Sequence, residues 1–102
     1  MKIPVSIGDR IELTHEASAT HRTLSKNVYN SQLLDLDGTD LAKLSMPIFE
    51  NRLIPLETGD EYQLCFFTRS GLYQCRGKVE KRYKENNMHV MDVRFLSQIK
   101  KY

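Results

Sequence analysis

The chain has 102 residues, of which 40% are hydrophobic and 27% are charged, and its formal net charge is only +2. These values are typical of one small folded domain and argue against an intrinsically disordered chain. No apolar run approaches the roughly 20 residues of a membrane-spanning helix, and the first residues do not resemble a signal peptide. We therefore expect a cytoplasmic protein without membrane insertion.

The charge is unevenly distributed along the chain. Residues 1–75 contain seven Lys and Arg against ten Asp and Glu, whereas residues 76–102 contain eight against three. A basic C-terminal quarter indicates either an anionic neighbour or exposed strand faces that carry Lys and Arg. The second explanation is the more common one.

Alternating apolar and polar residues predict a series of β-strands separated by turns. Ile11 and Leu13 share one face of the first strand, and no segment shows a convincing helical stripe. In chain order we expect strands at 10–15, 28–36 and 41–45, a loop at 16–27, turns at 37–40 and 85–87, a short strand at 53–54, a hairpin at 60–83 and a last strand at 88–96.

The hairpin at 60–83 is the element around which the rest of the chain is organised. Two alternating runs flank a Ser-Gly step at 70–71, and we expect these two residues to form the turn, with Gly at a positive φ. This turn sets Phe66 opposite Cys75 and makes one face of the hairpin apolar throughout. A slip by one residue would expose that face, so a half-buried sheet resists it.

Short strands without a helix predict an all-β domain. About six or seven antiparallel strands, rich in Tyr, Phe, Val and Ile, suit a small barrel or sandwich. Cys65 and Cys75 lie on opposite faces of the predicted hairpin, so a disulfide between them would need a different pairing. We expect two free thiols.

Searches for catalytic and metal-binding motifs find no complete one. His15 and Glu16 begin like the zinc motif HExxH, but position 19 is Ala. A catalytic cysteine would need a His or a helix N-terminus beside it, and the sequence identifies neither. We therefore expect no enzyme and no metal site. The other candidate ligands are His21, His89 and the carboxylates of a turn region, Asp35, Asp37 and Asp40, which turn chemistry explains better.

Nucleic-acid binding is the main alternative function. Small β-barrels often bind single strands through surface aromatic and basic residues. The modest net charge and the position of Tyr73 on the predicted core face argue against it. The residues that could form such a surface are Tyr73, Arg76, Lys78, Lys81, Arg82, Tyr83 and Lys84.

An ordered series of short segments covers nearly the whole chain. The segments are Ile7-Gly8-Asp9-x-Ile11-Glu12-Leu13, Tyr29-x-Ser31-x-Leu33-Leu34-Asp35, Leu44-Ser45-Met46-Pro47-Ile48, Leu53-Ile54-Pro55-Leu56-x-x-Gly59, Thr68-x-x-Gly71-Leu72-Tyr73 and Val79-Glu80-Lys81-Arg82. Together they resemble the N-terminal domain of YcgR-type flagellar brake proteins, the domain that precedes PilZ. The order of the segments carries the resemblance, because none of them is specific by itself.

The resemblance implies a PilZ-like split β-barrel and a role in cyclic di-GMP signalling. In the family, a following PilZ domain binds this nucleotide through an RxxxR segment at the junction and a (D/N)xSxxG motif on its barrel. Neither pattern occurs in this chain. The resemblance therefore implies that the chain itself has no cofactor, and that cyclic di-GMP binds to the full-length protein.

The resemblance also implies a domain organisation and a set of partners. Residues 1–96 would form the YcgR-like domain, and residues 97–102 would begin a linker to a C-terminal PilZ domain, trailing off as a polar, basic tail. Lys100, Lys101 and Tyr102 are then candidates for the hinge. The expected function is a non-catalytic regulatory domain of a flagellar brake, with the PilZ domain and flagellar motor proteins as partners and the motor base as its location.

Overall fold

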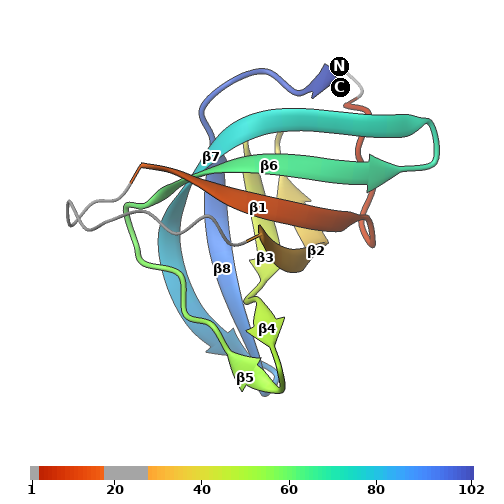
Figure 1. Ribbon diagram of the computed structural model, residues 1–102. Helices are drawn as coiled ribbons and strands as arrows, with labels where there is room; N and C mark the ends of the chain where they lie inside the picture. The colour runs from red at the N-terminus through yellow and green to blue at the C-terminus, as the bar shows by residue number, and fades with distance from the viewer. Residues whose placement is uncertain (1–2, 18–27) are drawn as a thin grey trace.

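The computed structural model describes residues 3–17 and 28–102. In these ranges the chain forms β-strands and no helix, which confirms the all-β prediction (Figure 1). The strands are β1 (Arg10–Ala17), β2 (Val28–Asp37), β3 (Leu41–Ser45), β4 (Ile48–Phe49), β5 (Arg52–Leu53), β6 (Glu61–Thr68), β7 (Gly71–Glu85), β8 (Met88–Phe95) and β9 (Lys100–Lys101).

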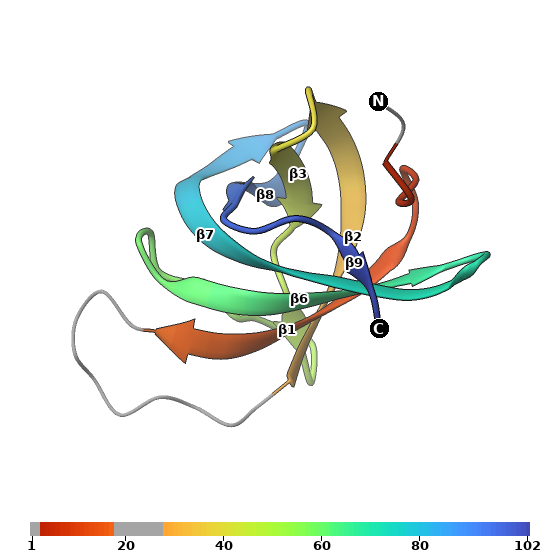
Figure 2. The same ribbon diagram turned by 90° about the horizontal axis from the view of Figure 1, so that it is seen from above.

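Six of these strands close into an antiparallel barrel. Their order is β6-β1-β2-β3-β8-β7, and β6 pairs with β7 to complete the circle (Figures 1 and 2). Strand β9 is added to β7, while β4 and β5 form a separate two-stranded sheet at one end of the barrel. Closure pairs strand edges that would otherwise be open, and it places alternate side chains inside.

The barrel interior contains the apolar face that the sequence predicts for each strand. Ile11, Leu13, Leu64 and Phe66 are fully buried. The Phe66 ring meets the Phe95 ring edge to face, with centroids 5.9 Å apart. Strand β8 likewise directs its predicted apolar residues Met91, Val93 and Phe95 into the barrel. The other buried apolar side chains include Leu33, Leu44, Tyr62, Val79, Met91 and Val93.

The register of the β6–β7 hairpin differs from the prediction by two residues. Phe66 lies opposite Tyr73 rather than Cys75, and the two residues between the strands are Arg69 and Ser70. Because side chains alternate with a period of two, a shift of two residues leaves every side chain on its predicted face. The apolar face was therefore predicted correctly although the pairing was wrong.

The Thr68 side chain explains where this turn forms. Its hydroxyl accepts a hydrogen bond from the Ser70 N–H at 3.2 Å and donates one to the Gly71 carbonyl at 2.7 Å. Gly71 does adopt a positive φ, of 124°, but as the first residue of β7. A threonine at the end of a strand can thus determine the turn, which the Ser-Gly pattern alone does not indicate.

Gly77 allows β7 to pack closely against the core. A Cβ at this position would lie 2.7 Å from Val93 Cγ1 and 2.9 Å from Leu64 Cδ1, well inside normal contact distance. Both neighbours are buried. The barrel wall therefore has no room for a side chain here.

Three short strands depart from the prediction. The short strand expected at 53–54 lies at Arg52–Leu53, and its partner β4 was not predicted. Residues 97–102 do not simply trail off, because β9 pairs with β7. β1 continues through Ala17, and the rest of the predicted loop at 16–27 lies outside the described residues.

Strand β3 is shorter than its neighbours β2 and β8, so these two strands are not joined by β3 at the β4–β5 end of the barrel. β3 ends at Ser45, and Pro47, which has no N–H to donate, follows closely. The Met46 N–H still binds the His89 carbonyl at 3.0 Å, and the Ile54 N–H binds the Pro47 carbonyl at 2.8 Å. The chain thus leaves the barrel wall here and folds over its end as β4 and β5 (Figure 1).

Candidate functional site

The first candidate surface is the outer face of β1, β6 and β7 beside β9. Lys101 pairs with Tyr73, and the Tyr102 N–H donates to the Leu72 carbonyl at 2.8 Å. Figure 2 shows β9 lying across the first part of β7. The Lys101 side chain passes over Gly71, where a Cβ would lie 3.4 Å from Lys101 Cε. The predicted hinge residues are therefore held on the β6–β7 hairpin.

A shallow depression of about 470 Å³ opens on this face. Phe67, Leu72 and Tyr102 supply its apolar lining, and the Tyr102 side chain is 77% exposed. The Arg10 guanidinium lies 3.7 Å from the centre of the Phe67 ring. Gln63 donates a hydrogen bond to Gln74 at 2.9 Å. This mixture of apolar, aromatic and amide groups suits contact with another protein surface.

The two cysteines are free, as the sequence predicts. Cys65 is half-buried on the outer face, whereas Cys75 points into the core. Burial raises the pKa of the Cys75 thiol to about 12. Burial, with a smaller contribution from the Glu12 carboxylate, also raises the pKa of Cys65. Both thiols are thus held in the protonated form, which is a poor nucleophile.

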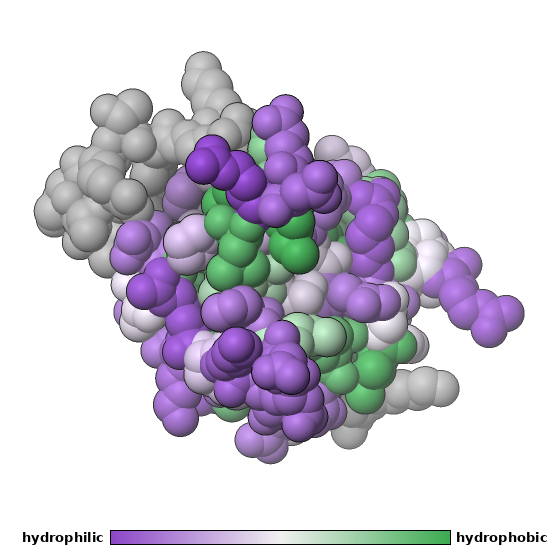
Figure 3. Space-filling model, turned by 90° about the horizontal axis from the view of Figure 1, so that it is seen from below, coloured by the Kyte–Doolittle hydropathy of each residue, from purple (hydrophilic) through white to green (hydrophobic). Residues whose placement is uncertain are grey.

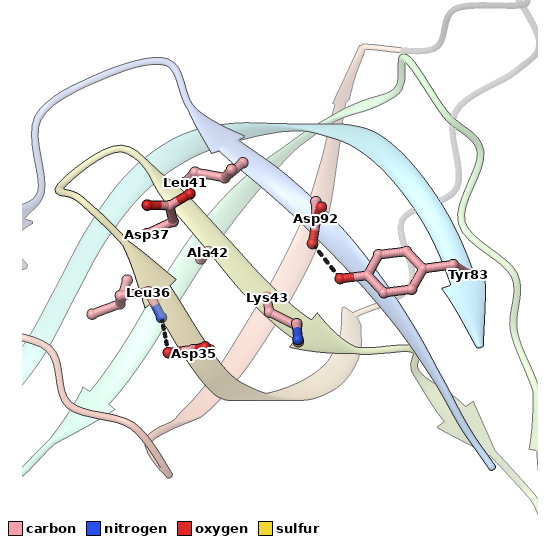
Figure 4. A pocket seen from close by; sticks show the side chains of 8 residues that line it. All are labelled: Asp35, Leu36, Asp37, Leu41, Ala42, Lys43, Tyr83 and Asp92. Atoms are coloured by element: carbon pink, nitrogen blue, oxygen red, sulfur yellow. Dashed lines mark hydrogen bonds between the residues drawn. The ribbon is translucent and has the colours of Figure 1, made fainter. Parts of the chain in front are cut away.

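A second depression lies on the outer face of β2, β3, β7 and β8 (Figure 4). The Tyr83 hydroxyl donates to the Asp92 carboxylate at 2.8 Å. Lys43 binds Glu85 at 2.7 Å, and this hydrogen bond raises the pKa of the lysine. The Asp35 carboxylate accepts the N–H of the next residue at 2.8 Å. The side chains of Asp35, Lys43, Tyr83 and Asp92 thus have partners within the fold.

The acidic turn cluster noted in the sequence is divided in the structure. Asp35 and Asp37 line the second depression, whereas Asp40 forms an ion pair with Arg94 at 3.2 Å. In the described ranges, no group of three His, Cys, Asp or Glu side chains could hold a metal ion. His15 and His89 belong to different regions, and His21 lies outside the described residues.

A buried polar pair inside the barrel was missed by the sequence analysis. His15 Nε2 lies 3.3 Å from Asp60 Oδ2, and the Asp60 side chain is fully buried. The imidazole stacks on the Tyr62 ring, with centroids 4.4 Å apart, and meets Tyr29 edge to face. Asp60 also joins backbone hydrogen bonds with Glu57 and Val79. The pair thus ties β1 to the segment that enters β6.

The basic residues of β7 do not combine with exposed aromatic rings. Arg76, Lys78, Lys81 and Lys84 are exposed. Tyr73 packs against the core, and the Tyr83 hydroxyl binds Asp92. Binding of a single-stranded nucleic acid needs aromatic faces on which bases can stack. The two tyrosines of β7 therefore provide no free stacking surface, and only the basic residues of this strand support nucleic-acid binding.

In the part of the chain that the structure describes, no helix is long and apolar enough to cross a membrane.

Comparisons with known proteins give one family and one solved fold. The model of the PilZNR family, described as "Flagellar protein YcgR", matches residues 6–95. The solved structure of the Bacillus subtilis inhibitor of motility, MotI/DgrA, is similar to this chain with a TM-score of 0.75 and 11% sequence identity. The similarity covers 98% of this chain and 47% of that chain. None of the curated proteins matches the sequence.

Proposed function

Because the chain belongs to the family of YcgR flagellar proteins, we propose that it acts in a cyclic di-GMP-responsive brake on flagellar motility. The family and the fold support a motility-control regulatory domain. The observation that carries the proposal is the family match over residues 6–95 on a barrel shared with an inhibitor of motility. In this proposal the domain is not an enzyme. It moves or docks in response to a nucleotide that binds to a neighbouring domain.

The neighbouring domain is a C-terminal PilZ domain in this proposal. Support comes from the family and from the solved relative, of which this chain spans 47%. The RxxxR and (D/N)xSxxG patterns that would hold cyclic di-GMP are missing from this sequence. Two arginines in a junction could hold the nucleotide by bidentate and stacking contacts, and ordering of that junction would reorient the two barrels.

The outer face beside β9 is the surface that we assign to the PilZ domain. Lys100, which pairs with Gln74, and Tyr102 lie on this face, whereas Lys101 pairs with Tyr73 and its side chain passes over Gly71 on the other side of the hairpin. In the proposal these residues form the start of the junction, and the two lysines attract the nucleotide phosphates. Flagellar motor proteins are the proposed downstream partners, at the cytoplasmic base of the motor.

Calorimetric titration with cyclic di-GMP tests the proposal. The 102-residue chain should bind weakly or not at all, and a longer form that continues into a PilZ domain should bind clearly. Equal binding by both forms, or by neither, would contradict the proposed mechanism. Salt-dependent binding of a single-stranded oligonucleotide by the short chain would instead favour the nucleic-acid alternative.

Lysine variants of the longer form test the junction separately. Replacing Lys100 and Lys101 together by Ala should weaken nucleotide binding several-fold, because two positive charges are lost beside the phosphates. The matched control replaces Lys78 and Lys84, two exposed lysines of β7, and should leave the affinity unchanged. Equal losses in the two double variants would indicate a general charge effect and no specific role for β9.

A further inference from the structure

A groove of about 550 Å³ lies at the end of the barrel that carries β4 and β5. It runs between the β4–β5 hairpin and the β7–β8 turn. Its apolar lining comes from Met46, Ile48, Leu53 and Met88. Figure 3 views this end and shows apolar side chains at the surface among hydrophilic ones. Ile48 is 64% exposed, which is unusual for a large apolar side chain beside others of its kind.

The groove lies beside a half-paired strand. β2 pairs with β1 over Val28–Gln32 and with β3 over Leu33–Asp37. The Gln32 N–H donates to the Ser45 hydroxyl at 3.0 Å and so faces the β3 side. Since backbone groups alternate between the two edges of a strand, Val28 and Asn30 direct their N–H and C=O groups to that same side. No described strand pairs with this edge before Leu33.

The polar rim of the groove is made of neutral and basic groups. Asn30, Asn86 and Asn87 line it with side-chain amides, and the titratable lining residues are Arg10 and His89. No carboxylate is among the lining residues in the described part of the chain. Amides can donate to and accept from a peptide backbone. Arg10 already forms an ion pair with the Glu12 carboxylate at 3.0 Å, so its charge is balanced and the rim suits a segment whose side chains are apolar or neutral.

We propose that this groove binds an extended peptide segment of a separate protein. The segment adds as a strand on the open edge of β2 at Val28–Asn30. Its alternate apolar side chains contact Ile48, Leu53 and Met88. In such strand addition, backbone hydrogen bonds provide affinity and side-chain pockets provide specificity. The β4–β5 hairpin lies at the opposite end of the barrel from the C-terminus (Figure 1), and among the groove residues Arg10 also packs on Phe67 of the proposed PilZ surface.

This inference goes beyond the proposed function, because it needs neither a nucleotide nor a PilZ domain. Its test uses the 102-residue chain and a display library of random 12-residue peptides as the probe. The selected peptides should carry apolar residues at alternate positions and neutral polar residues between them. Failure of the library to yield a binding peptide would overturn the proposal, while leaving the cyclic di-GMP titration unaffected.

A pair of matched variants locates the binding site of a selected peptide. Ile48→Ser should weaken its affinity about tenfold, because an exposed apolar contact is lost from the lining of the groove. Ile7→Ser is the control, since Ile7 is 62% exposed and does not line the groove. Equal affinities of the two variants would overturn the assignment of the site.

Backbone methylation of the peptide tests strand addition on the unaltered protein. N-methyl groups on one set of alternate residues should abolish binding, and those on the other set should be tolerated, because only one set faces β2. Equal tolerance of both sets would exclude a paired strand.

Sedimentation of the protein alone provides a further outcome. A dimer that Ile48→Ser dissociates would show that a second copy occupies the groove, and it would overturn the proposal of a separate partner.

Discussion

The hairpins β6–β7 and β4–β5 are both closed by two-residue turns, but different interactions hold them. β6 and β7 are long strands whose inner face is buried in the barrel. β4 and β5 have two residues each, and all four are exposed. An isolated hairpin of that length is not stable in water. The comparison indicates that the long hairpin supplies stability, whereas the short one is carried by the barrel and can serve as a contact surface.

The largest expected effect is a loss of core packing in the long hairpin. Phe66→Ala should lower the free energy of unfolding by about 3–5 kcal/mol, because it removes a fully buried ring and its contact with Phe95. Urea denaturation measures this change. Phe67→Ala, on the half-buried outer face, is the matched control and should cost clearly less. A loss below about 1 kcal/mol at Phe66 would show that the face assignment is inverted.

A smaller loss is expected from crowding the same hairpin. Gly77→Ala should destabilise the domain by about 1–3 kcal/mol, because the added methyl group meets Val93 and Leu64 inside contact distance. Thermal denaturation gives the size of the effect. Combining it with Val93→Ala should make the two costs less than additive, since the second change removes one of the colliding groups. Strictly additive losses of unfolding free energy would mean that the backbone of the barrel shifts to accommodate the added methyl group.

Cys75 gives the long hairpin a pH dependence. Its pKa is raised to about 12 in the folded state, so the unfolded chain loses this proton first. The stabilising contribution is complete below pH 9 and declines between pH 9 and about 12, by at most about 1.4 kcal/mol per pH unit. Urea denaturation of the native chain and of Cys75→Ala should diverge above pH 9. Parallel curves would contradict the buried thiol.

The smallest expected effect lies in the short hairpin. Ile48→Ser should change the free energy of unfolding by no more than about 0.5 kcal/mol, because the side chain is 64% exposed. Its melting temperature should match that of the native chain in the same scan. A large loss would show that β4 and β5 support the barrel, and the contrast between the two hairpins would then fail.

The sequence predicted most of the barrel because alternation is a strong signal over long strands. The third strand was predicted at 41–45 and is observed at Leu41–Ser45. The residues on the inner face of the long hairpin were also predicted correctly, because alternate residues of a strand point to the same face whatever the pairing. The pairing was wrong because the Thr68 hydroxyl determines the turn, and a side-chain hydrogen bond of this kind leaves no periodic pattern.

The surfaces were harder to predict than the core. β4 and β9 are two residues long, so no alternating pattern can indicate them. The His15–Asp60 contact joins residues 45 positions apart in the chain. It depends on the register of β1 against β6, which a single sequence does not contain. The groove depends on β3 ending before its neighbours, and only Pro47 hints at this in the sequence.

The end of the barrel at which the chain finishes has a practical consequence. Tyr102 lies away from β4 and β5, at the far end of the molecule (Figure 1). A biotin or a fluorophore attached there would hold the domain on a sensor chip with the β4–β5 hairpin directed toward the solution. A ligand of the groove could then be measured on an immobilised sample, whereas a label on Lys43 or Cys65 would sit on the barrel wall itself.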